Sequence, residues 1–248
     1  MKTPEIPPVP ARPLGKIAAF HCGNQEAHPT ESLAACLADC AKNTDLTDCL
    51  IVTPEGFNIV RGYWGANREL DRSISPALTL LAVQYKVTFV SGLIEEPEIA
   101  PGHSSVYLID GSERRLLSRK AGNDGSGNYT PCPDDWNRPI QHRGWCIGAL
   151  ICMDAGDFNS PPKERHNALL LRMAACEAGG SLLCIPARMQ SYGSRAVADA
   201  WPSHLTIAVA NGDLTQPSVI RPRAAIGSDP APAWYGGASN ALLIRSLA

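Results

Sequence analysis

The sequence predicts a single α/β domain whose sheets contain both parallel and antiparallel strand pairs. Short apolar runs bounded by Gly, Pro or Asp, as expected of strands, alternate along the chain with longer runs of helical spacing. Apolar residues make up 44% of the 248 residues, which is enough for a sizeable core. No linker, low-complexity run or internal repeat interrupts the alternation, so residues 1–248 are expected to form one domain.

The first half of the chain begins with a proline-rich lead-in over residues 1–14, because five prolines within residues 1–13 bar a regular element. Helical spacing then predicts a helix over about 30–42 and a second over 70–85, with a start after Ser75-Pro76 as the alternative. The strands predicted in this half are 16–20, 50–53, 87–92, 105–109 and 115–120, the last two joined by a hairpin-type turn at Asp110-Gly111.

The second half begins with a long loop over 121–139, rich in Gly, Asn, Asp and Pro, and loops of this length are often functional. A helix is predicted from Pro161-Pro162-Lys163 to a C-terminal cap at Gly179-Gly180. A shorter helix is predicted over 195–201, and residues 216–235 read as a Pro-rich loop. The strands predicted in this half are 147–151, 181–185, 205–210 and 241–244.

Charge and cysteine usage exclude several classes of protein. The formal net charge is −2 with no basic block, which argues against nucleic acid or an anionic membrane as a partner. No apolar run approaches the roughly 18–20 residues that span a bilayer, and no secretory signal opens the sequence. Nine cysteines without regular spacing favour free thiols in a reducing cytoplasm. No CxxC occurs, and Cys36/Cys40 has no His pair nearby, so no metal site is predicted.

Three predicted strands end on ionisable residues. Glu55 follows the strand over 50–53, Lys120 follows Leu116–Ser118 at the end of the strand over 115–120, and Cys152 follows the strand over 147–151. Taken singly, each has an ordinary explanation, because most cysteines are buried apolar groups and most strand-end Glu and Lys side chains are solvated. Open α/β sheets, however, place their chemistry at the carboxyl ends of their strands. We therefore expect the three side chains to meet in one site.

The segments around these residues resemble, in order, the Glu-Lys-Cys triad motifs of the nitrilase (carbon–nitrogen hydrolase) superfamily, in its amidase-like branch. They read I-V-T-P-E-G-F around Glu55, L-L-S-R-K ending on Lys120, and I-G-A-L-I-C-M-D around Cys152, with Ser118 and Met153 where the family has aromatic residues. The resemblance covers roughly residues 15–245. It implies a four-layer α-β-β-α sandwich, pairing of protomers into a homodimer or a higher homo-oligomer, and hydrolysis of a small linear amide or N-carbamoyl compound without metal or cofactor.

The chemistry of amide cleavage explains why these residue types are needed. A thiol of pKa about 8.5 is only a few per cent ionised at pH 7, so a base must take its proton. Glu55 is expected to be that base and later the acid that protonates the leaving amine. Lys120 and the backbone N–H of Met153 are expected to stabilise the tetrahedral oxyanion. The thioester on Cys152 would then be hydrolysed by water.

The chain departs from the family at the substrate pocket. Many members carry a second glutamate in the loop after the Lys, whereas the loop here reads N-Y-T-P-C-P-D-D-W, so Asp134 or Asp135 is the candidate replacement, with solvated loop acids as the alternative. The family's Arg-Ala-x-Glu-Asn helix is not reproduced cleanly around residues 195–201. Four further residues that flank the triad strands are candidate pocket walls, although core packing explains them equally well: Phe57, Trp136, Phe158 and Met189.

The sequence leaves other functions open. The same triad can transfer the acyl group to an amine instead of water, and a chain of this fold can be a non-catalytic binding protein. A Cys-His dyad has no local signature among the six scattered histidines, and His142 precedes the Cys152 strand, at its opposite end. Residues 122–127 read as a flexible loop, because no Lys-Ser/Thr and no helix follow them as a phosphate cradle requires.

Overall fold

Two sheets form the centre of the protein in the computed structural model, which describes residues 12–23, 28–61, 69–95, 102–123, 129–132, 137–156, 163–176, 178–189, 193–213, 215–223, 232–237 and 240–247. The seven-stranded sheet has the order β13 (Ala233–Gly236), β14 (Asn240–Ser246), β1 (Lys16–Cys22), β2 (Cys49–Val52), β5 (Thr88–Ile94), β6 (Ser104–Ile109) and β7 (Arg114–Arg119). The five-stranded sheet has the order β12 (Val219–Arg221), β11 (Thr206–Asn211), β10 (Gly180–Ala187), β9 (Trp145–Ala149) and β8 (Ile140–His142). A separate pair joins β3 (Ile59–Arg61) and β4 (Glu69–Leu70).

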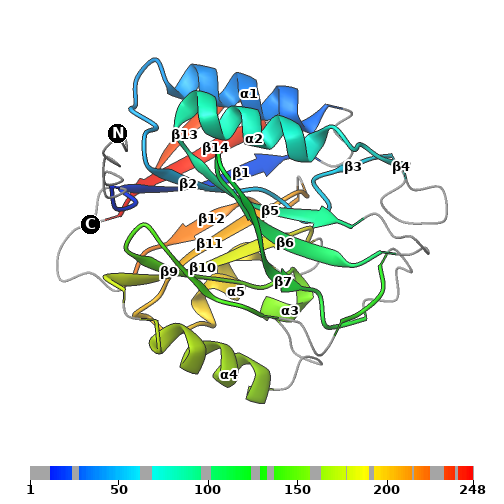
Figure 1. Ribbon diagram of the computed structural model, residues 1–248, viewed down its shortest axis with the longest axis vertical. Helices are drawn as coiled ribbons and strands as arrows, with labels where there is room; N and C mark the ends of the chain where they lie inside the picture. The colour runs from blue at the N-terminus through cyan, green and yellow to red at the C-terminus, as the bar shows by residue number, and fades with distance from the viewer. Residues whose placement is uncertain are drawn as a thin grey trace, which may run out of the picture.

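The helices lie outside the two sheets and complete the predicted four layers (Figure 1). Helices α1 (Pro29–Cys40) and α2 (Ile74–Tyr85) pack on the seven-stranded sheet, α1 against β13 and β14 and α2 against β5 and β6. Helix α4 (Lys163–Ala174) packs on β9, and the short α5 (Ser194–Asp199) packs on β11 and β12, while α3 (Met153–Gly156) is a single turn. The predicted α/β class, with two central sheets and helices outside them, is therefore confirmed.

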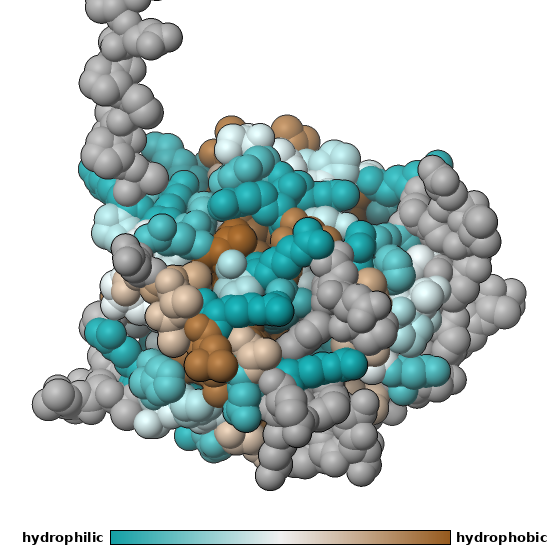
Figure 2. Space-filling view, turned by 60° about the horizontal axis from the view of Figure 1, so that its bottom comes forward, coloured by the Kyte–Doolittle hydropathy of each residue, from teal (hydrophilic) through white to brown (hydrophobic). Residues whose placement is uncertain are grey.

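Two apolar cores hold these layers together. The first lies between α1, α2 and the outer face of the seven-stranded sheet, and it contains Leu33 and Leu37 of α1 with Phe89 of β5. The second fills the space between the two sheets and continues under α4 and α5, where Val106 of β6 and Ile147 of β9 belong to it. Successive residues of one strand point to opposite faces, so neighbours along β6 enter different cores. Figure 2, which brings the α4 side forward, shows mostly polar side chains there, with apolar ones in small separate groups.

Parallel pairing brings several strand ends to one edge of the molecule. Strand β2 pairs in parallel with β1 and β5 in the first sheet, and β10 pairs in parallel with β9 and β11 in the second. The segments that follow β2, β9 and β10 therefore leave the sheets on the same side of each. Those segments carry Glu55, Cys152 and Arg188.

Several sequence predictions were wrong at the sheet edges. Residues 216–235, predicted as loop, contain β12 and part of β13, and β8, which directly follows the loop predicted over 121–139, was not predicted. The helix predicted over 70–85 begins at Ile74, because Glu69 and Leu70 pair with β3 instead. The strand predicted over 147–151 spans Trp145–Ala149. Short edge strands have weak local signals, since the neighbouring strand supplies most of their stabilisation.

Candidate active site

A buried ion pair joins the first two residues of the predicted triad. The Lys120 Nζ atom lies 2.8 Å from Glu55 Oε1, and the two side chains are 1% and 2% exposed. Glu55 comes from the turn after β2, and Lys120 follows β7, where its backbone N–H donates to the Ser104 carbonyl at 2.8 Å. Burial of both charges is costly unless each is paired, so this contact fixes the relative positions of the two strand ends.

The two oxygens of the Glu55 carboxylate differ in their hydrogen bonding. Its Oε1 also accepts a hydrogen bond from Ser104 Oγ at 3.1 Å. Its Oε2 is buried, and no hydrogen-bond partner is found for it within the described part of the chain. Arg188 Nε donates to the Glu55 backbone carbonyl at 2.9 Å, which anchors the turn from the β10 side. A carboxylate oxygen that is buried without a partner is available to accept a proton from a nearby donor.

The turn that carries Glu55 needs a glycine on the neighbouring strand. A Cβ at Gly92 of β5 would lie 2.8 Å from Glu55 Cα and 2.8 Å from Pro186 Cβ. The Gly92 carbonyl accepts the Phe57 N–H at 2.8 Å. Gly92 therefore lets the Glu55 turn and the end of β10 approach the same point of β5.

Cys152 has a left-handed backbone conformation, with φ at 47°. Its N–H donates to the Pro186 carbonyl at 2.9 Å, and its carbonyl accepts the Ala155 N–H at 3.1 Å. These two bonds tie the turn between β9 and α3 to the end of β10. A left-handed conformation is unfavourable for a residue with a Cβ and persists only where the surroundings impose it, and such residues cluster at functional sites.

The Cys152 thiol lies within the electrostatic reach of both other residues. The pKa of this thiol is raised to about 12, mainly by burial and then by the Glu55 charge, while the Lys120 charge and the Arg188 backbone N–H act in the opposite direction. The resting thiol is therefore protonated at neutral pH, and it stays so until a base takes the proton. Glu55, Lys120 and Cys152 thus belong to one electrostatic unit at the carboxyl edge of the sheets.

Asp154 is a residue of this site whose role the sequence analysis did not identify, although the C-M-D motif contains it. Its Oδ2 accepts the Ala121 N–H at 2.7 Å and its Oδ1 accepts the Gly122 N–H at 2.9 Å. Burial raises the pKa of this carboxyl group, and the two N–H donors and the Lys120 charge oppose the rise. Asp154 therefore fastens the segment after Lys120 to the turn after Cys152.

Lys120 has an aromatic neighbour that no local signal predicted. Its Nζ lies 4.6 Å from the centroid of the Tyr129 ring, and the Tyr129 hydroxyl donates to the Gly122 carbonyl at 2.7 Å. A cation near the face of an aromatic ring is stabilised in a desolvated site. The Tyr129 ring, on the loop that follows Lys120, thus stabilises the Lys120 ammonium group.

The candidate pocket residues have different positions. Phe57 is 1% exposed and lies in the core under α1 and α2, where its ring is edge-on to that of Phe20 at 6.0 Å between centroids. Phe57 is therefore a core residue and not a pocket wall. Met189 is buried in the same core as Cys152, where both its backbone groups bond the side chain of Asn211. Asp134, Asp135, Trp136 and Phe158 lie outside the described residues.

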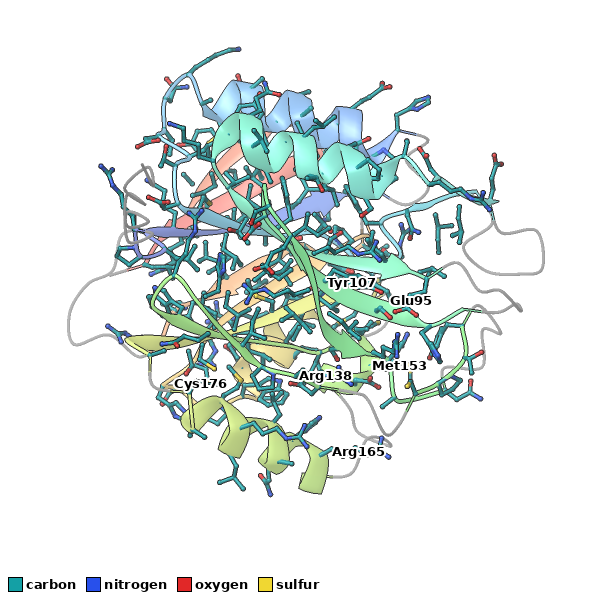
Figure 3. The ribbon with its side chains drawn as sticks, in the orientation of Figure 1. Glu95, Tyr107, Arg138, Met153, Arg165 and Cys176 are labelled. Atoms are coloured by element: carbon teal, nitrogen blue, oxygen red, sulfur yellow. The ribbon has the colours of Figure 1, made fainter. Side chains whose placement is uncertain are left out.

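Met153 and His142 lie where the sequence placed them. The Met153 side chain is 39% exposed, and Met153 begins α3 beside the Cys152 turn, at the same end of the strands as Glu95 and Tyr107 (Figure 3). First-turn N–H groups of a helix have no acceptor within the helix, so the Met153 N–H can serve an incoming oxyanion. His142 bonds Thr88, at the first residue of β5, and is therefore at the opposite end of the sheets.

No group of three or more His, Cys, Asp or Glu side chains within the described residues is arranged to hold a metal ion. Among the helices of those residues, none is long and apolar enough to cross a membrane.

Comparison with known proteins identifies the fold. No family model matches the chain, and no curated protein matches it in sequence. Solved structures of an amidase from Nesterenkonia sp. AN1 are similar to it. A glutamate-to-glutamine mutant, carrying acrylamide added at the active-site cysteine, aligns with a TM-score of 0.59 and 16% identity over 94% of this chain and 93% of that one. A cysteine-to-alanine mutant, described as belonging to the nitrilase superfamily, aligns with a TM-score of 0.60 and 15% identity over 97% and 93%. The same replacement in complex with butyramide aligns with a TM-score of 0.57 and 17% identity over 97% and 93%. The chain thus has the fold of nitrilase-superfamily amidases.

Proposed function

We propose that this chain hydrolyses the carbon–nitrogen bond of small linear amides through a thioester on Cys152, with Glu55 and Lys120 completing a catalytic triad. The observation that carries the proposal is the buried Glu55–Lys120 contact of 2.8 Å beside a protonated thiol, with Glu55 Oε2 buried and without a partner within the described residues. The fold adds support, since the similar amidase carries its acrylamide adduct on an active-site cysteine.

Acylation begins when the thiol proton moves to Glu55 and the sulfur attacks the carbonyl carbon of the amide. The carbonyl oxygen becomes an oxyanion, and Lys120 Nζ and the Met153 N–H stabilise it. One such donor is worth about 3–4 kcal/mol in the transition state. The intermediate collapses when Glu55 returns its proton to the nitrogen, so that ammonia or an amine leaves and a thioester remains on Cys152.

Deacylation repeats the sequence with water. Glu55 takes one proton from a water molecule, whose oxygen attacks the thioester carbon, and Lys120 again stabilises the oxyanion. The carbon–sulfur bond breaks, the sulfur regains a proton from Glu55, and a carboxylic acid is released. The sum is one amide and one water giving one acid and one amine, with the enzyme restored.

Small linear amides are the proposed substrates because the similar amidase was solved in complex with butyramide. N-carbamoyl compounds remain the second substrate class to test. The three triad side chains are almost fully buried, so the acyl group that reaches them must enter a confined site.

The test is turnover of a panel of linear amides, N-carbamoyl compounds and nitriles by the parent protein and by Cys152→Ala. We expect ammonia release from at least one amide by the parent and none by the variant. Mass spectrometry of the quenched reaction should show an acyl adduct on the peptide that contains Cys152. A matched control is Cys132→Ala, which removes a partly exposed thiol and should leave turnover unchanged.

The outcomes separate the alternatives. Hydroxamate formation that outpaces acid formation when hydroxylamine is added would assign acyl transfer. Unchanged turnover by Cys152→Ala would refute the nucleophile assignment. An intact fold with neither turnover nor adduct across the panel would favour a binding protein over an enzyme.

We also propose that the chain functions as a homodimer or larger homo-oligomer in a reducing cytoplasm. All nine cysteines are free thiols, and Leu171 on the outer side of α4 is 73% exposed. Light scattering of the purified protein would test the assembly, and a monomer at micromolar concentration would contradict it. Localisation of the tagged protein in its own cell would test the compartment.

A further inference from the structure

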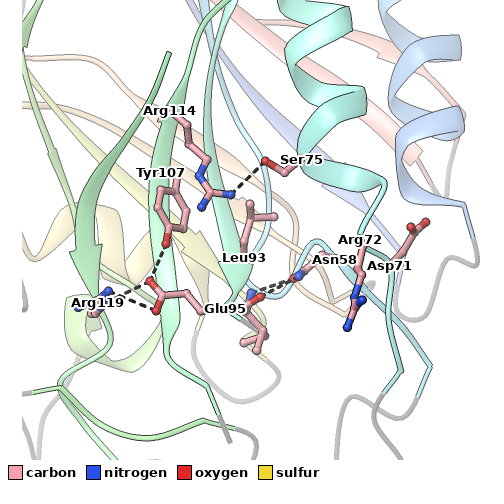
Figure 4. Close-up of a pocket in the computed structure, with 10 residues that line it drawn as sticks. Asn58, Asp71, Arg72, Ser75, Leu93, Glu95, Tyr107, Arg114 and Arg119 are labelled. Atoms are coloured by element: carbon pink, nitrogen blue, oxygen red, sulfur yellow. Dashed lines mark hydrogen bonds and ion pairs between the residues drawn. The ribbon is translucent and has the colours of Figure 1, made fainter. Parts of the chain in front are cut away.

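A cavity of about 450 Å³ opens on the outer face of the seven-stranded sheet, beside the amino end of α2 (Figure 4). Within the described residues its lining comes from the turn after β2, the start of α2 and strands β5, β6 and β7, and it includes Asn58, Ser75, Leu93, Tyr107 and Arg114. Its apolar floor is Leu93, which belongs to the core under α1 and α2; the buried Ile94 also lines it, and its walls are polar. None of the triad residues belongs to this lining.

The strands separate this cavity from the triad. On β6, the Ser104 hydroxyl donates to Glu55 on the inner face, and the next hydroxyl, that of Ser105, donates to Glu95 on the outer face at 2.7 Å. After β7, Lys120 pairs with Glu55, whereas Arg119 pairs with Glu95 at 3.1 Å. The two ion pairs therefore lie on opposite faces of the sheet, and a molecule in the cavity does not occupy the catalytic site.

The carboxylates of the cavity are already satisfied. Glu95 accepts hydrogen bonds from the Tyr107 hydroxyl at 2.6 Å and from two nitrogens of Arg119 in addition to Ser105. These donors lower the pKa of Glu95, so it stays ionised and paired. Asp71 Oδ1 accepts the N–H and the hydroxyl of Ser73, at 2.8 and 2.6 Å, and is used at the start of α2.

Arg114 is different, because its contacts are with neutral groups. Its guanidinium lies 4.3 Å from the centroid of the Tyr107 ring, and its Nη1 donates to the Ser75 hydroxyl at 3.3 Å. Within the described residues, no carboxylate is paired with it. Figure 4 shows the Arg114 guanidinium at the cavity wall, beside the Tyr107 ring. A guanidinium has five N–H donors, so Arg114 can bind an incoming group in addition to Ser75.

We propose that this cavity binds a small organic carboxylate, with its charged end on Arg114 and its carbon chain over Leu93. The Arg fork matches the two oxygens of a carboxylate, and the Ser75 hydroxyl at the first turn of α2 adds a further donor. The apolar floor favours an organic acid over inorganic phosphate, which offers nothing to bury there. This binding does not depend on the proposed hydrolysis, since it uses the other face of the sheet.

The test reads the cavity lining directly. The protein is labelled with 13C at isoleucine methyl groups, and the Ile94 signal, assigned through Ile94→Val, is followed during titration. The probes are butyrate, glutarate, neutral butyramide and inorganic phosphate, and butyramide is added to Cys152→Ala so that it is not converted into butyrate. The internal control is Ile220, on the five-stranded sheet. We expect saturable shifts of Ile94 with butyrate or glutarate at millimolar concentration, and none at Ile220.

Variants establish the role of the guanidinium. Arg114→Gln should weaken carboxylate binding about tenfold or more, the loss expected for a hydrogen-bonded charge partner, with unchanged melting temperature. Arg114→Lys should bind with intermediate affinity. The control Lys42→Gln removes one positive charge from an exposed residue beyond α1 and should bind as the parent does.

Three results would overturn the proposal. The first is that folded Arg114→Gln binds carboxylates with the same affinity as the parent. The second is that butyramide shifts the Ile94 signal as much as butyrate does. The third is that phosphate binds as tightly as any of the carboxylates. The readout is independent of turnover, so a protein without amidase activity that still binds butyrate at Ile94 would refute the proposed function and leave this inference standing.

Discussion

Replacement of Glu55 by Gln removes a base and unbalances a buried charge. General-base catalysis contributes about 10²–10⁴ in rate, so kcat should fall by at least about 10². Lys120 loses its partner at 2.8 Å, and both side chains are about 1–2% exposed. Breaking a buried ion pair on one side costs about 3–5 kcal/mol. For a chain of this size that loss lowers the melting temperature by about 6–20 °C.

The double variant Glu55→Gln/Lys120→Met separates the two effects. It removes both charges, and replacing a buried pair by neutral groups is often nearly neutral for stability. We therefore expect its free energy of unfolding to return toward that of the parent while activity stays absent. Urea denaturation and ammonia release are measured on both variants, with Glu31→Gln on the exposed face of α1 as a control of equal charge change. Equal stability of Glu55→Gln and the parent would refute the reasoning, because it would show that the Glu55 carboxylate does not stabilise the buried Lys120 ammonium group.

Three further changes test the frame around the triad. Asp154→Asn replaces one of two carboxylate oxygens by an NH2 donor beside the Ala121 or Gly122 N–H, so the free energy of unfolding should fall by about 1–3 kcal/mol and kcat should also fall. If both values equal those of the parent, Asp154 does not hold the two segments together. Gly92→Ala places a Cβ 2.8 Å from Glu55 Cα, and the overpacking should destabilise the fold by about 1–3 kcal/mol in thermal melts. The Cys152 pKa is raised from 9.0 to about 12, so the folded state keeps a proton that the unfolded chain releases above pH 9. The stability from that proton is present below pH 9 and is lost between pH 9 and 12, by up to about 1.4 kcal/mol per pH unit. Because burial also raises the pKa of other thiols such as Cys184, Cys152→Ala should show a smaller slope than the parent in urea titrations, and an equal slope would contradict this.

The sequence was sufficient to predict the strands that carry the triad. Apolar runs before Glu55 and Cys152 were continuous and ended at turn-forming residues, so these two strands could be predicted from local pattern alone, whereas only Leu116 and Leu117 are apolar in the strand before Lys120. Their convergence followed from the order of motifs and from the rule that parallel strands end on one edge. The four-layer arrangement came from the family resemblance and not from local pattern.

Contacts across the sheets could not be predicted in the same way. Arg188 reaches the Glu55 carbonyl from the end of β10, and nothing in the residues around either position indicates this pairing. Phe57 was a candidate wall because it follows Glu55 by two residues. The turn contains Gly56 with φ at 61°, which sends the chain back so that Phe57 enters the core under the helices. A residue's face after such a turn depends on backbone angles that residue types alone do not give.

One extra residue in β7 decides which face Lys120 reaches. Tyr107 pairs with Leu116 and its neighbour Val106 pairs with Ser118, so Leu117 is an additional residue opposite this step. Beyond this bulge, Arg119 pairs with Ser105 on the outer face, and Lys120 therefore points inward to Glu55. A β7 paired without the additional residue would reverse the two, because a shift of one residue turns every side chain to the opposite face. The lysine would then face the cavity and the arginine the triad. Bulges are known to redirect side chains beside active sites, and this one assigns the ammonium to the catalytic face and the guanidinium to Glu95.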